Sequence, residues 1–373
     1  MIYLDYAANT PAHEEVLKSF VDFSTQYIAN PNASHALGKE TKIVLDEATE
    51  RIAKLLGVQK SEIIYTSGAT ESNNLALKGI AHQYRRKGKH IITTYLEHSS
   101  VTSTVTALQN AGYEVDFVDV LNDGQVDLEH LKELLRPDTI LVSLSHVDSE
   151  VGIKQPLKAI HDLLEGYPNC FFHVDATQAI GKIPVDLKDV DLLTFAPHKF
   201  YGLNGIGMLI KKEPIMLEPV IHGGISTTAF RSGTPTLALI ESAAKALELA
   251  IPHIDERYTY VEGLNIKLRK GLEKYANVHI NSPKDASPFI VNFSVKGVNA
   301  AAFQQALEEC EIYVATKSAC CVVNTPSRPV YALTKDRKLA LSTLRISLSH
   351  LTTEEEIESF LEVFERSYKN LVK

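Results

Sequence analysis

The chain has 373 residues, of which 45% are apolar and 23% charged, and this length suffices for two domains that each bury a core. Its 46 acidic residues outnumber its 38 Lys and Arg residues, giving a formal net charge of -8, and its longest basic run is 85–87. A nucleic-acid partner is therefore not expected.

Short apolar runs alternate with longer segments of helical period from about residue 40 to about residue 255. This order is typical of a mostly parallel sheet whose strands are joined by crossover helices, so the fold class is predicted to be α/β. Strands are expected at 62–66, 90–94, 115–118, 140–144, 171–174 and 192–195, and helices at 71–86, 101–111, 128–135 and 156–164.

The last third of the chain has a different pattern. A long helical segment from 237 to 275 is interrupted at Pro252, and strands at 289–293 and 344–348 follow, with helices at 300–309 and 353–368. This mixture predicts a smaller α+β domain. We expect residues 13–255 to form the large domain, and residues 1–12 and 256–373 to form the small one.

The N-terminus has no basic stretch followed by an apolar one, and no run of about 18 apolar residues occurs anywhere in the chain. A cytoplasmic protein without a membrane partner is expected. The four cysteines, Cys170, Cys310, Cys320 and Cys321, form no C-x-x-C pair, which argues against a zinc site or a disulfide framework. No metal is expected.

Two chemically useful side chains follow neighbouring predicted strands. Asp175 comes directly after 171–174, and Lys199 follows 192–195. The carboxyl ends of parallel strands meet at one crevice, where ligands bind. A lysine and an acid placed there are what a pyridoxal 5'-phosphate site needs, the lysine to form a Schiff base and the acid to hold a proton on the pyridine nitrogen. Taken singly, each residue has an ordinary alternative: Asp175 could cap a helix, and Lys199 could be a solvated loop residue.

Two turns provide further candidates. Residues 65–74 read as a strand, a turn of small residues and a helix start, which could bind a phosphate or could be an ordinary capping box. His98 lies at the next strand-to-helix turn, where a histidine caps a helix or lies against a ring and moves protons.

The remaining candidates are thiols. Cys320 and Cys321 lie in an aperiodic segment, 316–326, where a cysteine is either a nucleophile or a small buried hydrophobe. Cys310 follows the apolar helical pattern of 300–309 and is expected in the core.

Together these segments resemble the cysteine desulfurases of the class V aminotransferase family, in its long-loop, NifS- and IscS-like group. The matching motifs span the chain in the family's order and lie at 3–8, 30–35, 66–74, 97–98, 173–178, 198–199, 231–234, 318–320 and 344–347. The resemblance implies a pyridoxal-phosphate-dependent transferase of fold type I.

The family's residue roles map onto this sequence. The resemblance implies Lys199 as the Schiff-base lysine, His98 on the cofactor ring and Cys320 as the sulfur acceptor, all three catalytic. It implies that the cofactor is bound by Ala69, Thr70, His98, Ser149, Asp175, Gln178, His198 and Lys199, with Thr234 contributed by the other subunit of a homodimer. Substrate contacts are implied for Arg345, which would bind the carboxylate, and Asn32. Two positions depart from the family: Ser149 stands where asparagine is usual, and Ala196 where serine is common.

The implied reaction converts L-cysteine to L-alanine and leaves a persulfide on Cys320. The sulfur would pass to an acceptor protein for iron–sulfur cluster assembly or for thiolation of tRNA or a cofactor. Two alternatives stay open: selenocysteine lyase or another pyridoxal-phosphate-dependent carbon–sulfur lyase, and a non-catalytic homologue that acts as a binding partner.

Overall fold

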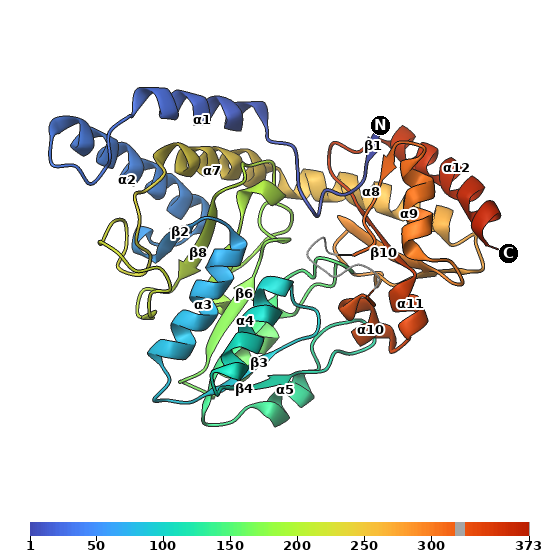
Figure 1. Cartoon of the computed structure of the whole chain (residues 1–373), viewed down its shortest axis with the longest axis horizontal. Coiled ribbons are helices and arrows are strands. Elements are labelled where there is room, and N and C mark those ends of the chain that lie inside the picture. Colours follow the sequence, from blue (N-terminus) through green and yellow to red (C-terminus); the bar gives the residue numbers. More distant parts are fainter. Residues whose placement is uncertain (318–324, 373) are drawn as a thin grey trace.

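The computed structural model describes residues 1–317 and 325–372. Its main feature is a seven-stranded sheet in the order β2-β8-β7-β6-β5-β3-β4 (Figure 1). The strands are β2 (Ile63–Thr66), β3 (His90–Thr93), β4 (Glu114–Phe117), β5 (Thr139–Ser145), β6 (Phe171–Asp175), β7 (Leu192–Phe195) and β8 (Gly207–Lys211). All six strands predicted in this region are confirmed. Strand β8 was not predicted, and it runs antiparallel to both of its neighbours.

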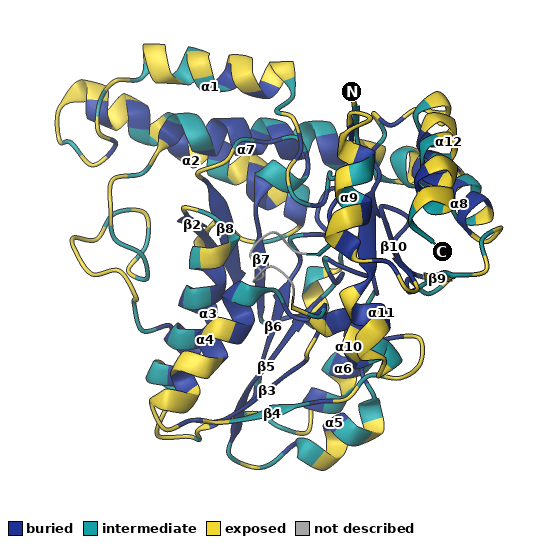
Figure 2. Cartoon of the chain, turned by 45° about the vertical axis from the view of Figure 1, so that its right-hand side comes forward, coloured by how far each residue is buried: buried dark blue, intermediate teal, exposed yellow. Residues whose placement is uncertain are grey.

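Helices cover both faces of this sheet. One face packs on α3 (Ala69–Gln83) and α4 (Ser99–Asn110), and the other on α2 (Ala36–Leu56), α5 (Leu128–Leu134), α6 (Leu157–Leu164) and α7 (Leu237–Ala250). The alternation of side chains along β2 shows why: Ile63 and Tyr65 join one core, and Ile64 the other. Coverage of both faces leaves β2, β3, β5, β7 and β8 buried along their whole length, whereas the edge strand β4 stays partly exposed (Figure 2). The α/β prediction is confirmed.

The N-terminal region adds α1 (Glu14–Gln26), which packs along α7. The expected long helix from 237 to 275 is divided at Pro252: α7 ends at Ala250, a short 3-10 turn, η4 (Ile251–His253), follows, and α8 (Ile254–Leu272) then leads to the second core.

The second core surrounds an antiparallel sheet in the order β12-β10-β9, with β9 (Val278–Ile280), β10 (Ile290–Val295) and β12 (Thr343–Ser347). Around it lie α9 (Ala300–Glu308), α10 (Arg328–Thr334), α11 (Arg337–Leu341) and α12 (Glu354–Leu371). A two-stranded parallel sheet pairs β1 (Ile2–Tyr3) with β11 (Ile312–Tyr313). The predicted strands and helices here are confirmed, and the domain boundaries at 12–13 and 255–256 stay a prediction.

Cys310 corrects one expectation, because it is exposed and not part of the core. Helix α9 ends at Glu308, and the Cys310 amide donates to the Leu307 carbonyl in the turn that follows. The helical period therefore stops before Cys310.

Among the described residues, none of the helices is both long and apolar enough to cross a membrane.

The second core predicts a large stability effect at Phe364. This side chain is fully buried, and its ring packs against those of Phe293, Phe303 and Phe360. We expect Phe364→Ala to lower the free energy of unfolding by about 3–5 kcal/mol, as large-to-small core substitutions do. Urea titration followed by circular dichroism measures the change. Leu351→Ala, at a half-exposed position, should shift the midpoint little, and an equal shift in both variants would contradict the assignment.

Candidate active site

A pocket of about 340 Å³ lies where the two cores and the N-terminal segment meet. Its walls come from the turn before α3, the ends of β5 and β6, the residues after β7, and Arg345 of β12. The lining residues are Ala7, Ala8, Ser67, Gly68, Ala69, Thr70, Glu71, His98, Ser145, Val147, Ser149, Asp175, Thr177, Gln178, His198, Lys199 and Arg345. The predicted crevice at the strand ends is therefore present.

Lys199 is held by the N-terminal segment, which we define as residues 5–10. Its Nζ donates to the carbonyls of Ala7 at 3.0 Å and Ala8 at 2.5 Å. The same segment binds the neighbouring residue, because the amide and the hydroxyl of Thr10 both donate to the His198 carbonyl. The solvated-loop alternative for Lys199 is therefore wrong: the amine lies inside the pocket, against two carbonyl oxygens.

Asp175 ends β6 and is buried. The amide of Asn73 donates to its Oδ2 at 2.8 Å, and the Thr177 backbone N–H donates to its Oδ1 at 3.0 Å. Asn73 Nδ2 also donates to Ser100 Oγ at 2.8 Å, and the Ser100 hydroxyl lies 2.8 Å from His98 Nδ1. A polar network thus connects the carboxylate to the imidazole beside the same pocket.

His98 matches both interpretations of its position. It is the N-cap of α4, since Nδ1 accepts from the Ser100 backbone N–H at 3.1 Å, and it also lines the pocket. The pKa of His98 is lowered, and burial of the ring is the largest cause. The charge of Asp175 raises this pKa and the charge of Lys199 lowers it, but both effects are smaller than that of burial.

The turn before α3 lacks the side-chain cap that the capping-box alternative requires. Gly68 is the N-cap and accepts nothing through a side chain, while the Ser67 amide donates to the Glu71 carboxylate. The turn lies directly on β8: a Cβ on Gly207 would fall 2.4 Å from the carbonyl carbon of Gly68. The first turn of α3 therefore opens into the pocket, as an anion site requires.

Gln178 is oriented by two contacts. Its Nε2 donates to the Ala7 carbonyl at 2.9 Å, and its Oε1 accepts from Lys182 Nζ at 2.8 Å. Burial, followed by the charges of Lys199 and Arg345, lowers the pKa of Lys182 to about 7. Burial is also the main reason why the pKa of His198 is lowered to about 4. The pocket thus concentrates basic groups that repel one another.

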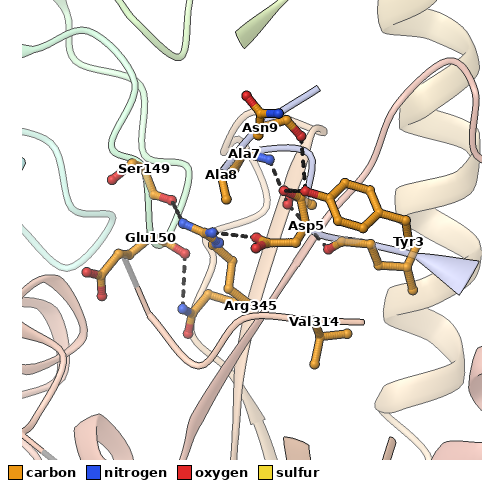
Figure 3. A network of polar contacts seen from close by, with 12 residues as sticks. Tyr3, Asp5, Ala7, Ala8, Asn9, Ser149, Glu150, Val314 and Arg345 are labelled. Atoms are coloured by element: carbon orange, nitrogen blue, oxygen red, sulfur yellow. Dashed lines mark hydrogen bonds and ion pairs between the residues drawn. The ribbon is translucent and has the colours of Figure 1, made fainter. Parts of the chain in front are cut away.

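Arg345 closes the side of the pocket formed by the second core (Figure 3). Its side chain is 2% exposed. One Nη donates to the Ser149 carbonyl at 2.8 Å, and the other lies 2.6 Å from Asp5 Oδ1. The guanidinium is thereby paired with an anion from the N-terminal segment.

Most of the predicted site residues come together here. Ala69, Thr70, His98, Ser149, Asp175, Gln178, His198, Lys199 and Arg345 all line the pocket. Three other positions lie outside its lining: Asn32, whose amide donates to Ser226 Oγ, the exposed Thr234, and the buried Ala196. Cys320 and Cys321 lie outside the described residues.

Sequence reasoning missed several polar contacts of the pocket. Asn73 could have been recognised, because it follows Ala69 and Thr70 by one helical turn. The carbonyls of Ala7 and Ala8 and the carboxylate of Asp5 could not, since no local pattern places the start of the chain beside Lys199 and Arg345. The Thr177 hydroxyl, on the pocket wall, is buried without a partner among the described residues.

Comparison with known proteins identifies what this chain is similar to. Residues 2–360 match the family model described as aminotransferase class-V. A cysteine desulfurase IscS of Dictyoglomus turgidum is 37% identical over 375 residues, 99% of this chain and 95% of its relative. A solved NifS-like protein has a TM-score of 0.93 at 36% identity, with 99% and 100% of the two chains covered. A structure of SspA in complex with cysteine has a TM-score of 0.83 at 31% identity and covers 95% and 100%.

The environment of His98 predicts its protonation state. We expect a pKa below the ordinary value of about 6.5, because burial disfavours the imidazolium and the Ser100 N–H requires a free lone pair on Nδ1. The ring should then be neutral at pH 7, and its protonation as the pH falls should cost stability. NMR titration of the ring signals of the cofactor-free protein, with His98→Gln to assign them, measures this pKa, and a value at or above 6.5 would contradict the expectation.

Proposed function

The chain belongs to the class-V aminotransferase family and is a cysteine desulfurase, and we propose that its pocket performs this reaction with pyridoxal 5'-phosphate bound to Lys199. The observation that carries the proposal is the convergence of the Lys199 amine, the Asp175 carboxylate and the Arg345 guanidinium, from three separate elements, on one pocket. The substrate is L-cysteine.

The residues present fit the cofactor. Asp175 is a buried carboxylate that is oriented by two hydrogen-bond donors, so it can hold a proton on a pyridine nitrogen. The uncapped turn at Gly68, Ala69 and Thr70, beside His198, can accept the phosphate. The Thr177 hydroxyl, which has no partner among the described residues, is available as a further donor.

The protein groups have distinct tasks. Bound pyridoxal 5'-phosphate supplies an aldehyde that takes up amines and a ring that accepts the electron pair released at the substrate Cα. Arg345 binds the substrate carboxylate and Lys199, once free, removes the Cα proton. His98, Gln178 and Ser149 line the same pocket, where His98 would lie against the cofactor ring and the other two would face the cofactor oxygen.

Sulfur transfer depends on the thiolate of Cys320. Its sulfur bonds to the substrate sulfur while the substrate C–S bond breaks, the electron pair left on Cβ takes a proton, and Lys199 returns to Cα the proton that it removed. The products are alanine and a persulfide on the protein. An acceptor protein then takes this sulfur for iron–sulfur cluster assembly or for thiolation of tRNA or a cofactor.

We propose a homodimer as the working form. Thr234 is exposed and lies outside the pocket of its own chain, in the segment that follows Arg231. Arg231 is tied by its Nε to the carboxylate of Glu71 at 2.9 Å, beside the turn that would hold the phosphate. In a dimer, Thr234 would reach the phosphate of the second copy.

The cofactor assignment predicts a complete loss in Lys199→Ala. We expect no turnover and no visible absorbance after reconstitution with pyridoxal 5'-phosphate, because Lys199 is the lysine that lines the pocket. Borohydride reduction of the wild type, followed by peptide mass spectrometry, should locate the cofactor on Lys199. The informative comparison is Lys182→Met, since Lys182 is the buried lysine bonded to Gln178. Attachment that survives in Lys199→Ala but is lost in Lys182→Met would refute the assignment.

The sulfur-transfer step predicts a different loss in Cys320→Ser. This variant should keep the visible absorbance of the cofactor but form no persulfide and no alanine from L-cysteine. Mass spectrometry of the protein for one added sulfur atom, with an alanine assay, tests both points. Cys310→Ser should behave as the wild type, because Cys310 is exposed and outside the pocket lining. A dead Cys321→Ser together with an active Cys320→Ser would show that the other thiol carries the sulfur.

A further inference from the structure

The ion pair between Arg345 and Asp5 joins residues 340 positions apart and lies at the pocket wall. Arg345 is almost fully buried, and its Nε has no partner among the described residues. A buried guanidinium requires a counterion, because burial disfavours an isolated charge. Asp5 supplies that counterion.

The position of Asp5 is fixed by contacts other than the one with Arg345. Its carbonyl accepts from the Tyr3 hydroxyl at 3.0 Å, and its backbone forms a parallel bridge with Ser347. Two residues later, the Ala7 amide donates to Ser347 Oγ at 2.9 Å. The N-terminal segment is therefore anchored on β12 by its backbone, and the charge on Asp5 can be changed without removing these anchors.

A substrate carboxylate that reaches Arg345 meets a cation that already has an anion beside it. The two carboxylates share one guanidinium and repel each other, which weakens the binding of the second. An amino acid without a negative charge at this position escapes the repulsion, although it also loses the attraction of Arg345. The charge of Asp5 therefore acts specifically on ligands that carry a carboxylate.

We propose that Asp5 is a positioning residue that moderates the affinity of Arg345 for the amino-acid carboxylate. The proposal rests on the assignment of Arg345 as the carboxylate site of the desulfurase. L-Cysteine and L-alanine carry the same carboxylate. Stronger binding of that carboxylate by Arg345 would therefore raise the affinity for substrate and product alike without favouring the transition state. By weakening the binding of the carboxylate to Arg345, Asp5 favours the release of alanine.

The test uses Asp5→Asn in the protein loaded with pyridoxal 5'-phosphate. Asparagine keeps the shape of aspartate, and its amide oxygen can still accept from Arg345, so the substitution removes charge while it preserves the hydrogen bond. Calorimetric titration with L-alanine should give a dissociation constant about tenfold lower than that of the wild type, a change typical of removing one nearby like charge. The KM for L-cysteine should fall as well, with kcat equal or lower.

L-Alaninamide is the matched control ligand, because it keeps the amine and the methyl group but carries no carboxylate. Its affinity should be the same in both proteins. Asp5→Glu restores the charge and should return the alanine affinity toward that of the wild type. Asp5→Ser, which removes the charge with a smaller side chain, provides the same comparison should Asp5→Asn fold poorly. Alanine binding that is unchanged or weaker in the uncharged variants overturns the proposal.

Failure of the underlying function would look different. If the wild type binds L-alanine no better than L-alaninamide, and Arg345→Met binds both as the wild type does, then Arg345 is not the carboxylate site and both proposals fall. If the wild type prefers L-alanine and Arg345→Met abolishes this preference, the site is correct. An unaltered preference in Asp5→Asn then refutes only the moderating effect of Asp5.

Discussion

The pocket depends on the alignment of three parallel strands whose carboxyl ends meet at one edge of the central sheet. Leu144 of β5 pairs with Val174 of β6, and Asp175 pairs with Thr194 of β7, so the residues that follow each strand emerge side by side. Asp175, Ser149 and Lys199 lie in one pocket for this reason. Because parallel strands buried on both faces tolerate little displacement, the sheet fixes where each of these segments leaves its strand, and contacts such as those of Lys199 with Ala7 and Ala8 then orient the side chains.

The same alignment explains what could be predicted from the sequence. Asp175 and Lys199 follow recognisable strands, so their convergence required only the rule that parallel strands share a direction. Asp5 and Arg345 meet through a pairing between the two ends of the chain, and no local pattern encodes that meeting. Strand β8 was missed although it is continuously buried, and its reversed direction depends on its pairing with β7 and β2.

The wrong expectation for Cys310 has a similarly local cause. Cys310 continues an apolar helical period, but the helix ends two residues earlier, so the period no longer determines which way the side chain points. Asn32 belongs to a matching motif and hydrogen-bonds to Ser226 outside the pocket lining, so its substrate role stays a prediction. The environment of Lys182 could not be predicted from the sequence either, because its burial beside Gln178 and Lys199 arises only when separate segments pack together.

The pairing of β1 with β11 has a consequence for the order in which the protein folds. The β1 strand pairs with residues 312–313, and Asp5 pairs with Arg345, so both contacts join segments that are far apart in the chain. Contacts of such high sequence separation form late and slow the folding of a chain. The pocket wall formed by Ala7 and Ala8 is therefore expected to be completed late in folding. A chain whose seven-stranded sheet has formed, but whose residues 5–10 have not yet docked, lacks the hydrogen bonds that Lys199 donates to Ala7 and Ala8, so docking of this segment is the step that positions the amine.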